Sequence, residues 1–186
     1  MAWISDDELM LMFADGSVEA FETLFERHRG SVYRFARSVL ADPSAAEEVL
    51  QDVFLAIVRS AKRYEPKGLF KAYLMRITRN TCLTRLEGER LRREMAAQFG
   101  RMEEPQTAAA DRGDDDRLAA VRRALRRLPD RQREAVMLHA FEQMTYQQIA
   151  DVLDTPINTV KTLIHRGRAA LAERLNGQST ENDDGV

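Results

Sequence analysis

Apolar residues recur every three or four positions along most of the chain, which is the spacing that places side chains on one face of an α-helix. No segment alternates apolar and polar residues as a half-buried strand does, and no Asn-Gly or Asp-Gly turn joins two such segments. The pattern therefore predicts an all-α protein.

Two capping signals begin helices near the start of the chain. Ser5 and Glu8 have the spacing of a capping box, and the helix that they begin can end at Gly16. Ser17 can cap a second helix. The apolar face of this second helix is expected to contain Phe21, Leu24, Phe25, His28, Val32, Phe35 and Val39.

Two further helices are expected in the first half. Asp42 and Pro43 suit the N-cap and the first turn of a helix. This third helix is expected to bury Leu50, Val53 and Ile57. Pro66 and Gly68 then interrupt the pattern, and a long helix follows from about residue 70 to residue 93.

The composition changes over residues 95–116, which contain Gly100, Pro105, Gly113, an alanine run and three consecutive Asp residues. This segment is typical of a flexible acidic linker. Helical periodicity returns over residues 117–175, and the polar residues 176–186 predict a disordered tail. We therefore expect two small helical domains, residues 1–94 and 117–175, each near the lower size limit for an independent core.

The charges are segregated along the chain, although the formal net charge is only −2. Residues 27–101 contain 16 Lys and Arg against 8 Asp and Glu, a net charge of +8, and residues 117–175 contain 11 against 6, a net charge of +5. Residues 1–26 contain seven acidic residues and no Lys or Arg. Two cationic blocks between acidic segments indicate a polyanionic partner that is contacted at two places.

The composition does not favour catalysis or a membrane location. Cys82 is the only cysteine, which excludes an internal disulfide, and a lone cysteine in an apolar helix is more typical of a core position than of a redox site. His28, His139 and His165 are too scattered to predict a metal site. No stretch approaches the roughly 18 to 20 apolar residues of a membrane span. We expect a cytoplasmic protein with no catalytic residue, no metal and no cofactor.

Residues 145–168 have the pattern of a helix-turn-helix. Thr145 and Gln148 form a capping-box pair, Asp154 falls at the turn, and Thr155 and Pro156 suit the start of the second helix. Glycine is usual at this turn because the backbone there has a positive φ, a conformation that Asp tolerates better than most residues do. The residues of the second helix expected to face inward are Val160, Leu163, Ile164 and Leu171.

The remaining positions of that second helix form a polar, partly cationic outer face. In a helix-turn-helix this helix enters the major groove of DNA. Short polar side chains near its start reach base edges, while Lys and Arg contact phosphates. A plain helical hairpin with a solvated polar face is the alternative. The residues expected to contact DNA are Thr155, Asn158, Thr159, Lys161, Thr162, His165 and Arg166.

Five other segments carry a family resemblance. They occur in this order: AFETLFERH at 20–28, AEEVLQDVFL at 46–55, FKAYL at 70–74, ITRN at 77–80 and LPDRQRE at 128–134. Together with the helix-turn-helix, they resemble the extracytoplasmic-function (ECF) group of bacterial RNA polymerase sigma factors. The resemblance covers nearly all of residues 17–175 and implies a transcription initiation factor that binds core RNA polymerase and promoter DNA.

The resemblance also implies roles for individual residues. The first domain would melt the −10 element, and the second would read the −35 element as duplex. Glu48 and its neighbours would contact the β′ clamp helices of the polymerase; the full set is Glu48, Gln51, Asp52, Phe54 and Leu55. The polymerase β flap would be a second contact. The melted −10 strand would be held by Tyr64, Lys67, Lys71, Arg76, Arg79, Asn80 and Thr84, since aromatic and cationic side chains together bind single-stranded DNA.

Some of these positions have a structural interpretation as well. The face that contains Glu48 and Leu55 could be a solvated surface, and Phe70 is more simply a core residue. The linker would extend toward the RNA exit path and the active-site cleft of the polymerase. An anti-sigma factor is an expected partner.

Two other classes of function account for part of the pattern. A helix-turn-helix regulator that acts without polymerase would use the same C-terminal motif, but it leaves the N-terminal segments unexplained. A nuclease is not indicated, because the chain has no glycine-rich phosphate loop and no His/Cys cluster, and its acidic run at 114–116 lies in the expected linker. We therefore predict a sigma factor and not an enzyme.

Overall fold

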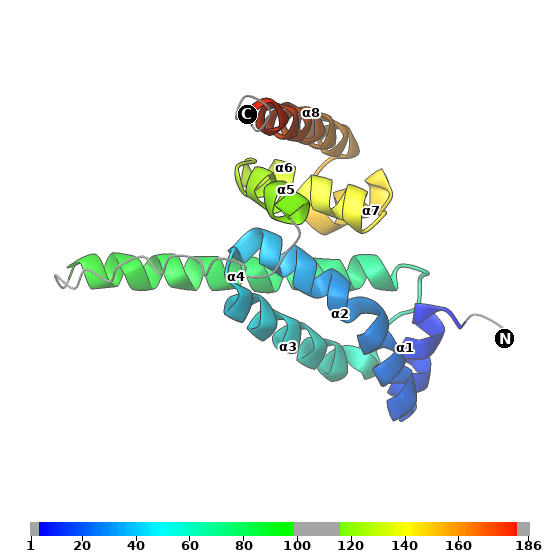
Figure 1. Ribbon diagram of the computed structural model, residues 1–186. Helices are drawn as coiled ribbons and strands as arrows, with labels where there is room; N and C mark the ends of the chain where they lie inside the picture. Colours follow the sequence, from blue (N-terminus) through cyan, green and yellow to red (C-terminus); the bar gives the residue numbers. More distant parts are fainter. Residues whose placement is uncertain (1–3, 99–115, 182–186) are drawn as a thin grey trace. The chain divides into compact units, whose positions relative to one another are not determined.

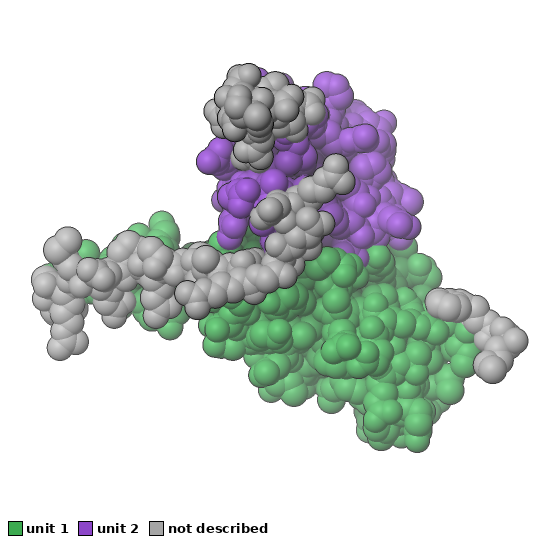
Figure 2. All heavy atoms as spheres, viewed as in Figure 1, with its two compact units in different colours: residues 1–109 green, residues 110–186 purple. Residues whose placement is uncertain are grey.

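A computed structural model describes residues 4–98 and 116–181 of the chain, and these residues form helices and turns without strands. The chain divides into two compact units, residues 1–109 and residues 110–186 (Figure 2). The prediction of an all-α protein with two small helical domains is confirmed. Within the described ranges, no helix is both long and apolar enough to cross a bilayer.

The first unit contains α1 (Asp6–Ala14), α2 (Val18–Leu40), α3 (Pro43–Ser60), the short 3-10 helix η1 (Ala61–Arg63) and α4 (Phe70–Gln98). Helices α2, α3 and α4 pack against one another, and α1 lies against α2 and η1 (Figure 1). Cys82 is buried in this core, as expected. The fully buried core side chains include Leu24, Phe35, Val53, Ile57, Leu74 and Met75.

The first three helices begin where the capping signals predict. The Ser5 Oγ accepts a hydrogen bond from the Glu8 amide at 3.2 Å, and the Glu8 carboxylate accepts one from the Ser5 amide at 2.8 Å. Ser17 and Asp42 cap α2 and α3 with a single bond each, in which the side chain accepts from the amide of Ala20 or of Ser44. These caps satisfy amide groups that have no partner inside the helix, so the sequence fixes each starting point locally.

Helix α4 is longer than the periodicity predicts and reaches Gln98, four residues into the expected linker. Its last turns are exposed and extend beyond α2 and α3 (Figure 1). Glu89 pairs with Arg93 at 3.5 Å, and Arg90 pairs with Glu94 at 3.6 Å, both with i,i+4 spacing. Such pairs stabilise a helix without help from a core, and an apolar pattern does not reveal them. Residues 99–115 of the expected linker lie outside the described residues.

The second unit contains α5 (Asp116–Arg126), α6 (Asp130–Val136), the wider π-helical turn η2 (Met137–Phe141), α7 (Tyr146–Leu153) and α8 (Ile157–Glu181). Helix α8 packs against α5, α6 and α7. It continues to Glu181, six residues into the expected tail, and residues 182–186 lie outside the described residues.

Close packing of α8 on α6 depends on a glycine. A Cβ atom on Gly167 would lie 2.6 Å from Cγ2 of Val136 and 3.3 Å from the Gln132 carbonyl oxygen. Both distances are too short for ordinary contact, so only glycine lets the two helices approach this closely.

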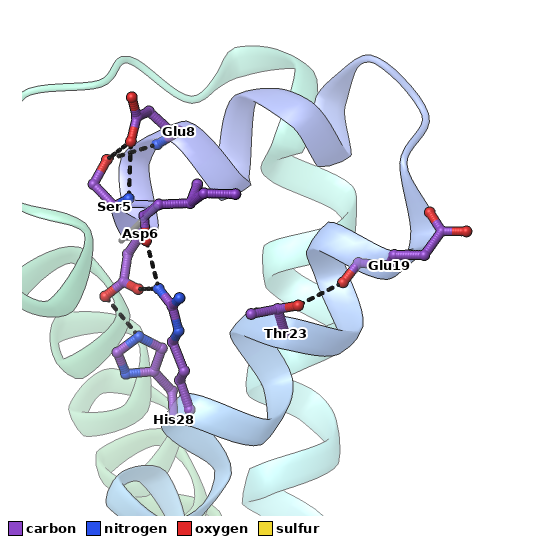
Figure 3. Close-up of polar contacts among 8 residues, drawn as sticks. Ser5, Asp6, Glu8, Glu19, Thr23 and His28 are labelled. Atoms are coloured by element: carbon purple, nitrogen blue, oxygen red, sulfur yellow. Dashed lines mark hydrogen bonds and ion pairs between the residues drawn. The ribbon is translucent and has the colours of Figure 1, made fainter. Parts of the chain in front are cut away.

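Charged side chains hold the start of α1 to the middle of α2 (Figure 3). One carboxylate oxygen of Asp6 lies 2.9 Å from the Arg27 Nη1, and the other lies 2.8 Å from the Nε2 of the buried His28. Arg27 also donates a hydrogen bond to the Ile4 carbonyl at 2.9 Å. The hydrogen bond with His28 is the largest cause that lowers the pKa of Asp6 below its ordinary 3.8; partial burial opposes this, and the bond from Arg27 adds to it.

Replacing Asp6 tests this attachment through its pH dependence. A carboxyl whose pKa is lowered by folding stabilises the fold above its ordinary pKa, and this contribution is lost as the pH falls through the lowered pKa. We expect D6N to reduce the free energy of unfolding of the first unit by about 0.5–1 kcal/mol at neutral pH, because the pair is partly exposed. Urea unfolding of both proteins should show the difference shrinking in acid.

The matched control for this change is D15N, at the exposed C-cap position that directly follows α1. It removes the same charge close to the same helix but leaves the contacts of Asp6 in place. Equal losses from D6N and D15N at neutral pH, or a D6N loss that persists in acid, would show that Asp6 does not attach α1.

Candidate nucleic-acid and polymerase interfaces

The second unit contains the helix-turn-helix that the sequence predicts. The Thr145 hydroxyl accepts a hydrogen bond from the Gln148 amide at 3.2 Å, and the Gln148 side chain accepts one from the Thr145 amide at 2.9 Å. Ile149 and Leu153 of α7 are fully buried. Asp154 has φ 48° and ψ 58°, the left-handed conformation expected at this turn. The local geometry of the motif is therefore as predicted.

Helix α8 has one buried face and one polar face. Val160 and Ile164 are buried, while Leu163 and Leu171 are half-buried. The polar face that the sequence assigns to DNA is exposed at Asn158, Thr159, Lys161, Thr162, His165 and Arg166. These positions share one side of the helix because residues three and four apart lie on the same face. The structure thus brings six of the seven predicted residues together on one accessible strip.

Thr155, the seventh predicted residue, takes a different role. Its side chain is half-buried and donates a hydrogen bond to the Leu153 carbonyl at 3.0 Å. It also accepts one from the Arg131 Nη1 at 3.1 Å. The hydroxyl therefore bonds within the turn and toward α6, where the sequence suggested that it would cap α8. Helix α8 itself begins at Ile157, one residue after Pro156.

In the first unit, α4 presents an exposed polar strip formed by Arg76, Asn80 and Thr84, which are spaced four residues apart. Arg79 was also predicted to contact the −10 strand, but it is only 9% exposed and lies on the buried side of α4, with Met75 and Cys82. It does not join the exposed strip, because the position one residue before Asn80 is rotated by about 100° around the helix.

The loop before α4 contains the other predicted −10 residues. Tyr64 is half-buried, and its hydroxyl donates a hydrogen bond to the Asp7 carboxylate on α1. Its ring lies 5.9 Å from Phe70 and 5.4 Å from Tyr73 between centroids. Burial raises the pKa of the Tyr64 phenol above its ordinary 10, and the Asp7 hydrogen bond raises it further, so this group remains a donor. Phe70 is buried, which confirms its core assignment.

The lysines of this loop differ in exposure. Lys67 is exposed and pairs with Glu65 at 2.8 Å, while Lys71 is half-buried at the start of α4. The exposed ammonium group of Lys67 can exchange this weak surface pair for a phosphate. Loop and strip together offer one aromatic ring and several cations along a single unit, the combination that suits a single strand.

The third candidate surface lies on α3. Glu48, Gln51, Asp52 and Leu55 are exposed as predicted, and the Glu48 carboxylate pairs with Arg85 of α4. Phe54 was assigned to the same surface, and this prediction is wrong. Phe54 is 4% exposed, and its ring lies 4.7 Å from Phe25 between centroids, inside the core.

Sequence reasoning missed one member of the α3 surface. Val58 is 43% exposed and lies three residues after Leu55, which is 50% exposed. The two apolar side chains form the centre of a face whose other members are polar. The sequence could have indicated Val58, because it lies three residues after Leu55 and residues three or four apart share one face of a helix. Across the described residues, no three His, Cys, Asp or Glu side chains come together as metal ligands.

Two family models match the chain. Sigma-70 region 2 matches residues 24–92, and sigma-70 region 4 matches residues 118–171. The first range contains every predicted −10 and polymerase-contacting residue, and the second contains every predicted −35 residue. These matches define the class as a two-domain transcription factor of the sigma-70 type.

Curated relatives give the narrower family. The chain is 32% identical to the ECF RNA polymerase sigma factor SigK of Mycobacterium sp. (strain KMS) over 174 residues, which cover 91% of this chain and 90% of SigK. It is 33% identical to the ECF RNA polymerase sigma factor SigM of Mycobacterium tuberculosis (strain H37Rv) over 176 residues, which cover 95% of this chain and 87% of SigM. The chain therefore belongs to the ECF family of RNA polymerase sigma factors and directs transcription initiation at promoters.

Solved structures of similar proteins agree with this family. The chain matches CnrH, solved in complex with the cytosolic domain of CnrY, with a TM-score of 0.70, 26% identity and coverage of 92% of this chain and 97% of CnrH. It matches the sigma factor RpoE of Bartonella quintana, solved with the anti-sigma factor NepR, with a TM-score of 0.71, 25% identity and coverage of 86% and 98%. Members of this family are transcription initiation factors and are not known as enzymes.

Proposed function

We propose that the three surfaces divide promoter recognition among them. The polar face of α8 reads the −35 element as duplex, the α4 strip and the Tyr64 loop hold the melted −10 strand, and the exposed face of α3 docks on the β′ clamp helices of core polymerase. The observation that carries this proposal is the exposed polar face of α8 in a fully formed helix-turn-helix.

The chemistry of each surface suits its assigned partner. Asn158 and Thr159 lie near the start of α8, where side chains reach base edges, and Lys161 and Arg166 supply charge for phosphates. On α4, Asn80 offers a side-chain amide to an unpaired base, while Arg76 contacts the backbone. On α3, Leu55 and Val58 supply an apolar centre within a polar rim, which is the usual composition of a protein interface.

An anti-sigma factor that covers these surfaces, a contact with the polymerase β flap and a cytoplasmic location are parts of the same proposal. The RpoE neighbour was solved with an anti-sigma factor, which supports a regulatory partner of that kind for this chain. Residues 117–175 carry a net charge of +5, which an acidic surface on such a partner would match.

Promoter-directed transcription is the direct test. Purified chain is added to core RNA polymerase that lacks any other sigma factor, with a pool of fragments of the source genome as template. We expect transcripts that start at defined positions downstream of a shared two-part sequence. Core polymerase alone, which starts without such selection, is the control. A chain that binds core polymerase but leaves start sites unselected would overturn the proposal.

The α3 surface predicts different outcomes for two neighbouring residues. We expect L55A to leave the unfolding midpoint unchanged and to weaken binding to core polymerase by about tenfold, since it truncates an exposed apolar residue at the centre of the face. F54A should cost the first unit about 3–5 kcal/mol, because it empties a core position. Chemical unfolding and a fluorescence binding titration measure the two effects. If L55A binds core polymerase as tightly as the wild-type chain does, α3 is not part of the interface.

The α8 face predicts a division between specific and general contacts. We expect N158A to change the preference at one −35 position by about 1–3 kcal/mol, because a side-chain amide pairs with one base edge. K161A should weaken all duplexes alike and lower the salt dependence by about one counterion, because it contacts a phosphate. Holoenzyme titrations against duplexes with single −35 substitutions distinguish these effects. The same response from both variants would contradict the assignment.

A further inference from the structure

The turn between α7 and α8 is held by an unusual set of bonds. Asp154 adopts the left-handed conformation at φ 48°, where a residue with a Cβ atom is strained relative to glycine. The amides of Asp154 and Thr155 both donate to the Ala150 carbonyl, the latter at 3.0 Å. This turn sets the direction in which α8 leaves α7, and therefore the angle at which its polar face meets a duplex.

A side chain from α6 bonds to both neighbours of Asp154. The Nη1 atom of Arg131 donates to the Leu153 carbonyl at 2.9 Å and to the Thr155 hydroxyl at 3.1 Å. The Thr155 hydroxyl in turn donates to the same Leu153 carbonyl at 3.0 Å. The three groups form a closed set of hydrogen bonds around the strained residue.

The position of Arg131 suits this role electrostatically as well. The Leu153 carbonyl lies at the C-terminal end of α7, where helix carbonyls lack partners inside the helix and carry partial negative charge. A guanidinium group satisfies that carbonyl and is favoured there. Arg131 extends from α6, which Gly167 holds tightly to α8, so the bond ties the turn to the body of the unit.

We infer that Arg131 is a positioning residue for promoter reading: it holds the left-handed turn at Asp154 in place and thereby fixes the orientation of α8. The inference rests on the proposed reading of duplex by α8. A glycine at position 154 would adopt the left-handed conformation without strain. In this chain Asp154 occupies that position, and the hydrogen bonds from Arg131 of α6 hold the turn in the same conformation. Arg131 and Asp154 are therefore energetically coupled.

The coupling predicts a specific rescue. When the turn loses its clamp, only a fraction of molecules hold α8 correctly, and the apparent affinity for duplex falls by that fraction. We expect R131Q to weaken binding of holoenzyme to −35 duplex by about fivefold, and the double variant R131Q/D154G to recover to within about twofold of wild type, since glycine adopts the turn without strain. Two controls separate charge from conformation. R127Q removes an arginine charge from the exposed segment just before α6, and R131Q/D154A removes the Asp charge but keeps a Cβ atom.

A second measurement reads the turn without DNA. Hydrogen exchange at the Thr155 amide, which donates to Ala150, reports opening of the turn in the full-length chain. We expect exchange at this amide to be about tenfold faster in R131Q, unchanged in R127Q, and near the wild-type rate in R131Q/D154G. Recovery of both exchange and binding in R131Q/D154G, and not in R131Q/D154A, is the result that establishes the inference.

Other outcomes overturn it. Weaker binding by R131Q with unchanged exchange, a lower salt dependence and no recovery by D154G would make Arg131 a phosphate contact. If R131Q leaves both duplex binding and exchange at the Thr155 amide unchanged, Arg131 has no role at the turn. If wild-type holoenzyme shows no preference for the −35 duplex, the proposed function fails, while the exchange rates still decide whether Arg131 holds the turn.

Discussion

The contact between α6 and α8 decides what the second unit presents to solvent. At Gly167 the two helices approach so closely that a methyl group would overlap Val136. Val160 and Ile164 lie on the same side of α8, seven and three residues earlier, and are buried. Because that side of α8 is packed against α6, the polar residues between positions 158 and 166 on the opposite side face the solvent. The candidate DNA face is thus a product of core packing as much as of the polar residues themselves.

Charged contacts join separate helices and turns in both units. Asp6 joins α1 to the middle of α2, Asp7 reaches the loop before α4, and Arg131 joins α6 to the turn of the helix-turn-helix. Each bond contributes on the order of 1 kcal/mol, no more than burial of one large apolar side chain. Their main effect is on geometry, since each fixes the position of a segment that function uses.

The local features of this protein could be read from its sequence. The caps at Ser5, Ser17 and Thr145 each bond to an amide three residues later, so the start of each helix can be predicted from a short stretch of sequence. The polar face of α8 follows from helical spacing alone. Phe54 was misassigned because a matching segment identifies a stretch of helix but not its face, and Leu55, its neighbour, points the other way.

The contacts between distant residues could not be read in this way. Tyr64 and Asp7 are 57 positions apart, and Arg131 and Leu153 are 22 apart. No periodicity or local motif joins them, because they meet only after the helices have packed. The extra length of α4 was missed for a different reason: surface ion pairs support its last turns, and an apolar pattern does not register them.

The single thiol of the chain is a chemical probe for opening of the first unit. Cys82 has no exposed surface in the folded first unit, and the sequence contains no other cysteine. An alkylating reagent reaches the sulfur only when the structure around it opens, so the rate of labelling reports those openings. A partner that binds and stabilises the first unit slows the labelling.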